Sequence, residues 1–172
     1  WRMMSAGDAH MNILRATAAV FGAGLGGADS ITVLPFSLAQ GLPDAFARRI
    51  ARNTQSVLLA ESNLWRVSDP AHGAGAIENL TRALSENAWE GFQRIESEGG
   101  IVASLDSGAL QSRIAAARDA RLAEVKNGKR AIIGTTLYKP PHLIAASIAD
   151  IAPVFPALPG LAPQRLAEAF ET

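Results

Sequence analysis

Histidine and acidic side chains are the first candidates for chemistry in this sequence. The three histidines are His10, His72 and His142, and no two of them have the spacing of metal ligands. Each lies in a turn-like setting, which favours a solvated or capping role. The acids Glu61 and Asp69 fall near the ends of expected elements, and spacing alone does not make them a catalytic pair. The residues by themselves therefore predict no catalytic group and no metal site.

Two further features, a glycine-rich run and a cluster of arginines, are of the kinds that bind anions, and each also has a structural explanation. The glycine-rich run from Gly22 to Gly27 follows an expected helix and lacks the Lys-Ser/Thr pair of a phosphate loop, so it predicts a helix stop. Arg48, Arg49 and Arg52 crowd one helix and suit a phosphate, but a solvated helix face also explains them. No Gly-x-Ser-x-Gly elbow and no His-Glu-x-x-His zinc motif is present.

Composition narrows the class of protein. The 172 residues are 48% hydrophobic and 19% charged, as in a folded domain with its own core. The formal net charge is zero, which argues against nucleic-acid binding. Cysteine is absent, which fits the cytoplasm and excludes a disulfide framework. The chain begins with Trp1, so we expect a processed or truncated form of a longer polypeptide, and no signal peptide is recognisable.

The residues that must position any site fall into alternating elements. The helical period and its stop signals predict helices at Asn12–Phe21, Leu42–Ser62, Ile77–Gly99, Gly108–Lys126 and Gln164–Glu171. Short β-branched or apolar runs predict strands at Trp1–Gly7, Ser30–Leu34, Arg66–Ser68, Ile101–Ser104 and Ala131–Leu137. The tract from His142 to Leu161 contains Asp150 and three prolines, so we interpret it as a surface or linker segment and not as a membrane helix.

Alternation of strands and helices predicts an α/β fold with a parallel sheet. Only three or four such units fit in this length, whereas a closed eight-unit barrel needs about 250 residues. The sequence leaves two architectures open, a small open α/β sheet or part of a (β/α)8 TIM barrel. Because parallel strands do not leave long bare edges in water, a partial barrel would need a cover.

The helix that begins near Leu42 carries the clearest pattern. Pro43 and Asp44 suit a first turn, and an apolar stripe follows at helical spacing. Thr54 lies on that stripe, so its hydroxyl needs a hydrogen-bond partner. In the helix Gly108–Lys126, by contrast, the charged side chains indicate a solvated face. These are Arg113, Arg118, Arg121, Glu124 and Lys126.

Four motifs in order resemble the methylmalonyl-CoA mutase family. Leu42 to Gln55 (LPDAFARRIARNTQ) is similar to the family run ending RIARNTQ, and Arg66 to Glu78 (RVSDPAHGAGAIE) is similar to a strand and loop of the type DPWGGS. Leu84 to Gly100 resembles a helix that ends in a GGM-like segment. Ile114 to Lys126, with Gly128 and Ile132 to Gly134 behind it, resembles the family's next helix and strand.

The resemblance implies part of a (β/α)8 barrel and a 1,2-rearrangement of an acyl-CoA that depends on adenosylcobalamin. It implies that residues 1–138 are the C-terminal portion of the barrel. Residues 139–172 would be a Pro-rich segment and the start of a linker toward a cobalamin-type domain. Gln55 and Glu78 are the positions that the resemblance assigns to cofactor contact; no catalytic residue and no metal ligand is expected.

Departures from the family pattern shape the functional prediction. Arg2 stands where catalytic members have a histidine, Thr32 to Leu34 replace a polar strand end, and Ala71 and His72 replace Trp-Gly. A site without its hydrogen-bonding groups does not orient a polar substrate. Framework positions nevertheless remain, namely Asn53, Gln55, Asp69, Pro70, Gly73 and Glu78.

This pattern predicts the noncatalytic small-subunit portion of a heterodimeric mutase. Its partner would be the catalytic large subunit, which would bind adenosylcobalamin and interconvert methylmalonyl-CoA and succinyl-CoA; no nucleic acid or membrane is expected as a partner. Two alternatives remain, a self-sufficient acyl-CoA mutase of the same family and an unrelated α/β binding module.

Overall fold

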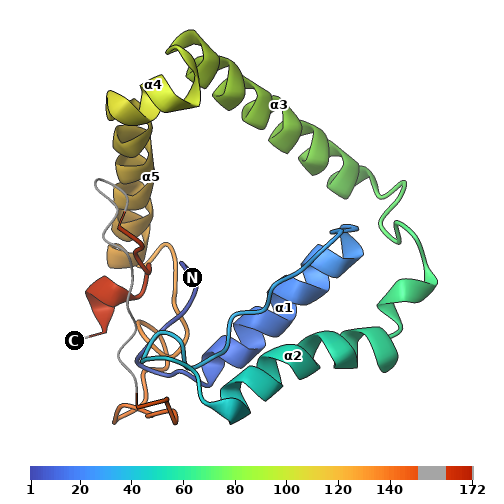
Figure 1. Cartoon of the computed structure of the whole chain (residues 1–172), viewed down its shortest axis with the longest axis vertical. Coiled ribbons are helices and arrows are strands. Elements are labelled where there is room, and N and C mark those ends of the chain that lie inside the picture. The colour runs from blue at the N-terminus through green and yellow to red at the C-terminus, as the bar shows by residue number, and fades with distance from the viewer. Residues whose placement is uncertain (151–161, 172) are drawn as a thin grey trace.

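The computed structural model describes residues 1–150 and 162–171. Within these ranges the chain is helical, and its elements lie around an open frame (Figure 1). The α-helices are α1 (Met11–Leu25), α2 (Ala45–Ala60), α3 (Gly75–Ser97), α4 (Gly100–Asp106) and α5 (Ala109–Lys126). Two 3₁₀ turns complete the elements, η1 (Leu64–Arg66) and η2 (Glu168–Phe170).

Helix α2 begins at Ala45, three residues later than the sequence indicates, so Pro43 and Asp44 precede the helix and do not form its first turn. The Asp44 side chain caps the helix by accepting a hydrogen bond from the Ala47 amide at 2.7 Å, which satisfies one of the free amides of the first turn. Arg48 donates to the Pro43 carbonyl at 2.8 Å, which fixes the chain entering the helix. The Thr54 hydroxyl donates to the Ile50 carbonyl at 2.9 Å, so the predicted need for a partner on the apolar stripe is confirmed.

The expected α/β fold is wrong. Residues 1–150 and 162–171 contain no named strand, only isolated bridges such as the one between Asp8 and Ile144. A parallel-sheet portion of a (β/α)8 barrel therefore does not describe this structure. The physical reason is that a β-branched run becomes a strand only when a second strand satisfies its amides and carbonyls, and no such neighbour is present here.

Each expected strand adopts another conformation in the structure. Ser30–Leu34 has no regular secondary structure, Arg66 ends the turn η1, and Ile101–Ser104 lies inside helix α4. Ala131–Leu137 folds on itself, with Thr136 donating its amide to the Ile132 carbonyl at 2.8 Å. Trp1–Gly7 starts with a turn. The expected helix Gln164–Glu171 is also too long, since only η2 forms there.

Two small apolar clusters form the core. The first joins the α1–α2 pair to the chain before and after it, and the second joins the end of α5 to the C-terminal segment. The first consists of Ala9, Phe36 and Ala47 with Ile13, Ile50 and Ala146, and the second of Val125, Ile132 and Ala167 with Leu166 and Phe170.

Helix α3 lies outside both clusters. It packs mainly against α4, and none of its 23 residues is buried. Exposed fractions of 49% for Ile77, 60% for Leu80 and 61% for Leu84 show an apolar stripe facing water. The chain exposes 11629 Å², whereas a compact monomer of 18.1 kDa exposes about 8,100 Å². An unusually large part of the surface is thus left for other contacts.

The corner between α3 and α5 is held by an ion pair. Arg113 of α5 donates to the Glu98 carboxylate, with one N–O distance of 3.1 Å, and the Ser104 hydroxyl donates to the same carboxylate. Hydrogen bonds from Arg113 and Ser104 lower the pKa of Glu98. Arg113 therefore does not lie on a solvated face, as the sequence suggested, but links two helices.

No helix in the described ranges is at once long enough and apolar enough to cross a bilayer. The boundary expected at residue 138 stays a prediction. Residues on its C-terminal side return to the α1–α2 pair, where the Ala146 amide donates to the Gln40 side chain at 2.7 Å. The expected surface or linker tract lies partly outside the described residues, because it includes 151–161.

Candidate functional site

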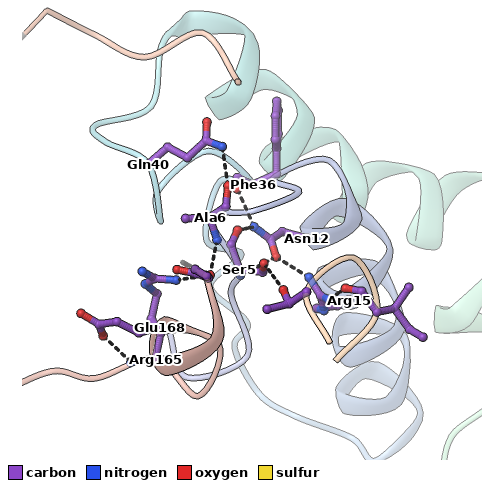
Figure 2. A network of polar contacts seen from close by, with 11 residues as sticks. Ser5, Ala6, Asn12, Arg15, Phe36, Gln40, Arg165 and Glu168 are labelled. Carbon is purple, nitrogen blue, oxygen red and sulfur yellow. Dashed lines mark hydrogen bonds and ion pairs between the residues drawn. The ribbon is translucent and has the colours of Figure 1, made fainter. Parts of the chain in front are cut away.

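A buried polar network lies where the N-terminal segment meets α1 (Figure 2). Asn12, in the first turn of α1, is fully buried and uses all of its hydrogen-bonding capacity. Its amide nitrogen donates to the carbonyls of Ser5 and Phe36 at 2.8 and 2.9 Å. Its oxygen accepts from the Ser5 amide at 2.9 Å and from Arg15 at 2.8 Å. One side chain thus joins three separate parts of the chain.

Ser5 extends the network to the loop after α5. Its hydroxyl pairs with the Thr135 hydroxyl at 2.7 Å, and both side chains are buried. Arg15 donates a further hydrogen bond to the Ile133 carbonyl in the same loop. Gly134, between them, has a φ of +76°, and an added Cβ would lie 3.0 Å from the Asp8 Cβ. This loop therefore fits the network only with glycine at its centre.

The C-terminal segment closes the network on its other side. Glu171 accepts hydrogen bonds from the Ala6 amide at 2.6 Å and from Arg165 at 2.7 Å. The side chains of this Arg165–Glu171 pair are only 10% and 12% exposed. Burial acts to raise the pKa of Glu171, but these hydrogen bonds and the Arg165 charge outweigh it and lower the pKa. A carboxylate held in this way is a weak general base.

The charges around Arg15 also indicate a structural role for this side chain. Burial lowers the pKa of Arg15, while the charges of Asp8 and Glu171 act to raise it. The Asp8 Oδ1 atom is buried and accepts no hydrogen bond from the described residues. The charges of Asp8 and Glu171 thus partly offset the cost of burying Arg15.

The predicted cofactor positions lie apart from this network. Gln55 is half-buried on α2, whereas Glu78 is exposed in the first turn of α3 and accepts from the Gly73 amide at 3.2 Å. His72 lies in the same loop, with its Nδ1 atom 3.3 Å from the Asp69 carboxylate. Within residues 1–150 and 162–171, neither Gln55 nor Glu78 lines a described cavity, and no cluster of potential metal ligands occurs.

Other residues singled out by sequence are also separated. Arg48, Arg49 and Arg52 are exposed on α2, and His10 packs its ring against Phe36 with centroids 5.1 Å apart. Asn12, Ser5 and Thr135 were not among the functional or structural residues predicted from the sequence. A polar residue in an Ala-rich helix was the available signal for Asn12, but the pairing of Ser5 with Thr135 spans 130 residues and has no local pattern.

A second concave region lies between α5 and the C-terminal segment. It is a cavity of about 480 Å³ with arginines at its edge, two of which belong to the helix face that was expected to be solvated. The side chains that line it include Arg2, Ile114, Arg118, Arg121, Leu122, Arg165 and Leu166. The sequence signal for this cavity was the helical spacing of Ile114, Arg118 and Leu122, which places an arginine between two apolar side chains on one face of α5.

Comparison with known proteins identifies the family. The family model for methylmalonyl-CoA mutase matches residues 2–153. The methylmalonyl-CoA mutase small subunit of Streptomyces virginiae is 45% identical over 98% of this chain and 27% of its own length. The small subunit of Propionibacterium freudenreichii subsp. shermanii is 42% identical over 99% of this chain and 27% of its own length.

A protein of Escherichia coli K12 named methylmalonyl-CoA mutase is 35% identical over 84% of this chain and 20% of its own length. The chain thus spans about a quarter of the length of the small subunits it matches. The matched residues include helix α2, the loop before α3 and, from the buried network, Ser5, Asn12 and Thr135. The chain belongs to the methylmalonyl-CoA mutase family.

Proposed function

We propose that the chain is part of the noncatalytic small subunit of a heterodimeric methylmalonyl-CoA mutase and that it helps this subunit to pair with the catalytic large subunit. The observation that carries the proposal is the order of the similarities. Two small subunits match almost the whole chain at 45% and 42% identity, above the 35% of a relative whose name specifies no subunit, although another small subunit is only 36% identical. The rearrangement of methylmalonyl-CoA and succinyl-CoA would then take place in the large subunit.

The buried network supports a framework role. Asn12 has every donor and acceptor engaged, the Ser5 and Thr135 hydroxyls pair with each other, and Glu171 has a lowered pKa. Asn12 therefore has no hydrogen-bonding capacity left for a substrate, and the other three side chains hold distant chain segments together. The expected cytoplasmic location remains part of the proposal.

Adenosylcobalamin would act at the level of the complex. The contacts predicted for Gln55 and Glu78 stay predictions; neither side chain lines a cavity described within residues 1–150 and 162–171, which supports placing the cofactor chiefly on the large subunit. When bound, the cofactor supplies radical chemistry. We therefore assign its binding to the large subunit and derive no step from these two residues.

The apolar stripe of α3 is the surface that supports subunit pairing. Leu80, Leu84 and Phe92 are 60%, 61% and 50% exposed, and Trp89 stacks on Phe92 with ring centroids 5.3 Å apart. Contiguous apolar surface of this kind marks an interface. The matched small subunits are far longer than this chain, which spans 27% of their length, so the rest of the small subunit is itself available to cover part of α3. We propose the large subunit as the occupant of the stripe, and co-purification distinguishes it from the rest of the small subunit.

Co-purification tests this assignment. The chain, produced as part of the full small subunit, is expected to retain the purified large subunit, and the double variant Leu80→Glu/Leu84→Glu is expected to lose it. Asn79→Glu/Ala83→Glu, on the exposed face of the same helix away from the stripe, is the matched control and should retain the partner. Retention by the double variant would show that α3 is covered by other residues of the small subunit. Turnover by the full gene product without a large subunit would refute the small-subunit assignment and favour a self-sufficient mutase.

A further inference from the structure

The cavity between α5 and the C-terminal segment has the size of a ligand site. Its volume of about 480 Å³ falls within the range of roughly 300–1,000 Å³ that is common for small-molecule pockets. Its two walls are held together independently of any ligand. Leu166 donates its amide to the Arg2 carbonyl at 3.1 Å, and Arg118 donates to the Gln164 side chain at 3.1 Å. Figure 1 shows the C-terminal segment alongside α5.

Positive charge is concentrated at this cavity. Arg2, Arg118, Arg121 and Arg165 line it, against the single acid Glu168. A chain of zero net charge has no general reason to place four arginines around one pocket. The planar guanidinium group matches carboxylate and phosphate groups through paired hydrogen bonds.

Two of the four arginines are already committed to the fold. Arg165 pairs with Glu171 at 2.7 Å and lies over the Trp1 ring at 5.9 Å, and Arg118 pairs with Asp119 at 2.7 Å. Within residues 1–150 and 162–171, Arg2 and Arg121 have no side-chain hydrogen bond or ion pair. Both are exposed and able to meet a ligand. The cavity therefore has two fixed and two available cations.

The wall between the arginines is apolar. Ile114 and Leu122 of α5 face Leu166 of the C-terminal segment across the cavity. We propose that this cavity binds a small organic anion, with its carboxylate or phosphate group at Arg2 and Arg121 and its apolar body against Ile114, Leu122 and Leu166. The proposal goes beyond subunit pairing and does not depend on it, because the site lies entirely within this chain.

Calorimetric titration of the 172-residue chain tests the site with three probes of equal chain length. Octanoate and octyl phosphate carry the anionic group, and octanamide is the neutral match for octanoate. At least one anion is expected to bind one-to-one, and octanamide at least about tenfold more weakly. Acetate, which lacks the apolar body, is also expected to bind at least about tenfold more weakly. The stronger of the two anions identifies the head group that the arginines prefer.

The double variant Arg2→Gln/Arg121→Gln is expected to weaken binding of that anion by about tenfold or more, about 1.4 kcal/mol. Arg49→Gln/Arg52→Gln, on the exposed face of α2, removes the same charge elsewhere and should leave Kd unchanged. Circular dichroism checks that both double variants keep the fold. The absence of saturable binding would overturn the proposal, as would equal affinity for octanamide or an equal effect of the two double variants.

Discussion

Helices α2 and α3 have similar sequence patterns and opposite environments. Both are amphipathic, but α2 buries Ala47, Ala51 and Leu58 against its surroundings, whereas no residue of α3 is buried. The difference lies in the neighbours. Helix α2 packs against α1 beside the polar network, and α3 is attached chiefly through α4 (Figure 1). An apolar stripe therefore predicts that a helix forms and which face needs a cover, but not whether this chain provides the cover.

The largest contrast is expected between two asparagines. Asn12→Ala would leave the Ser5 amide and the carbonyls of Ser5 and Phe36 buried without partners, so the free energy of unfolding should fall by about 3 kcal/mol. Asn87→Ala on α3 removes only an exposed hydrogen bond to the Ala83 carbonyl and should change it by less than about 0.5 kcal/mol. Urea unfolding followed by circular dichroism measures both. Equal effects would mean that the network does not stabilise the fold.

Leucine truncation tests the apolar sides of the same two helices. Leu58→Ala on α2 removes a side chain that is 7% exposed and should cost about 2–3 kcal/mol. Leu84→Ala on α3, where the leucine is 61% exposed, should cost less than about 0.5 kcal/mol. Urea midpoints at equal protein concentration provide the comparison. A large loss at Leu84 in the isolated chain would show that α3 is already covered in solution.

Two glycine-to-alanine substitutions are expected to change the free energy of unfolding in opposite directions. Gly134→Ala meets a φ of +76° and the Asp8 side chain, so it should cost about 2 kcal/mol. Gly91→Ala lies within α3 with open space around the added methyl group, so it should stabilise the helix by about 0.5–1 kcal/mol. Thermal unfolding of the two variants measures the difference. Stabilisation by both would place the loop at Gly134 in another conformation.

The smallest expected effect concerns pH. Because the pKa of Glu171 is lower in the folded chain than its ordinary value, the ionised form contributes stability above about pH 4.5, and this contribution is lost as the pH falls through the lowered pKa. Glu171→Gln should therefore flatten the decline in unfolding midpoint between about pH 5 and pH 3. Glu96→Gln, on the exposed face of α3, is the matched control. An unchanged slope in Glu171→Gln would contradict an ionised, hydrogen-bonded carboxylate.

Sequence reasoning succeeded where a local pattern was sufficient. The helices around α1, α2, α3 and α5 and the family were predicted from residues close together in the chain, and Asp44 was placed at the start of α2, where it is the N-cap. It failed for the strands, because Ser30–Leu34 has the composition of a strand but no neighbouring strand to complete its hydrogen bonds. It also treated Arg113 as solvated, since nothing near it in sequence reveals its pairing with Glu98.

By itself the sequence determined the approximate positions of the main helices and the family. Only the tertiary structure decided that Ser5, Asn12, Thr135 and Glu171 share one network and that α3 stays uncovered. The physical reason is the separation along the chain of the groups that interact. Helix formation and capping depend on groups a few residues apart, whereas burial and strand pairing depend on which distant segments meet.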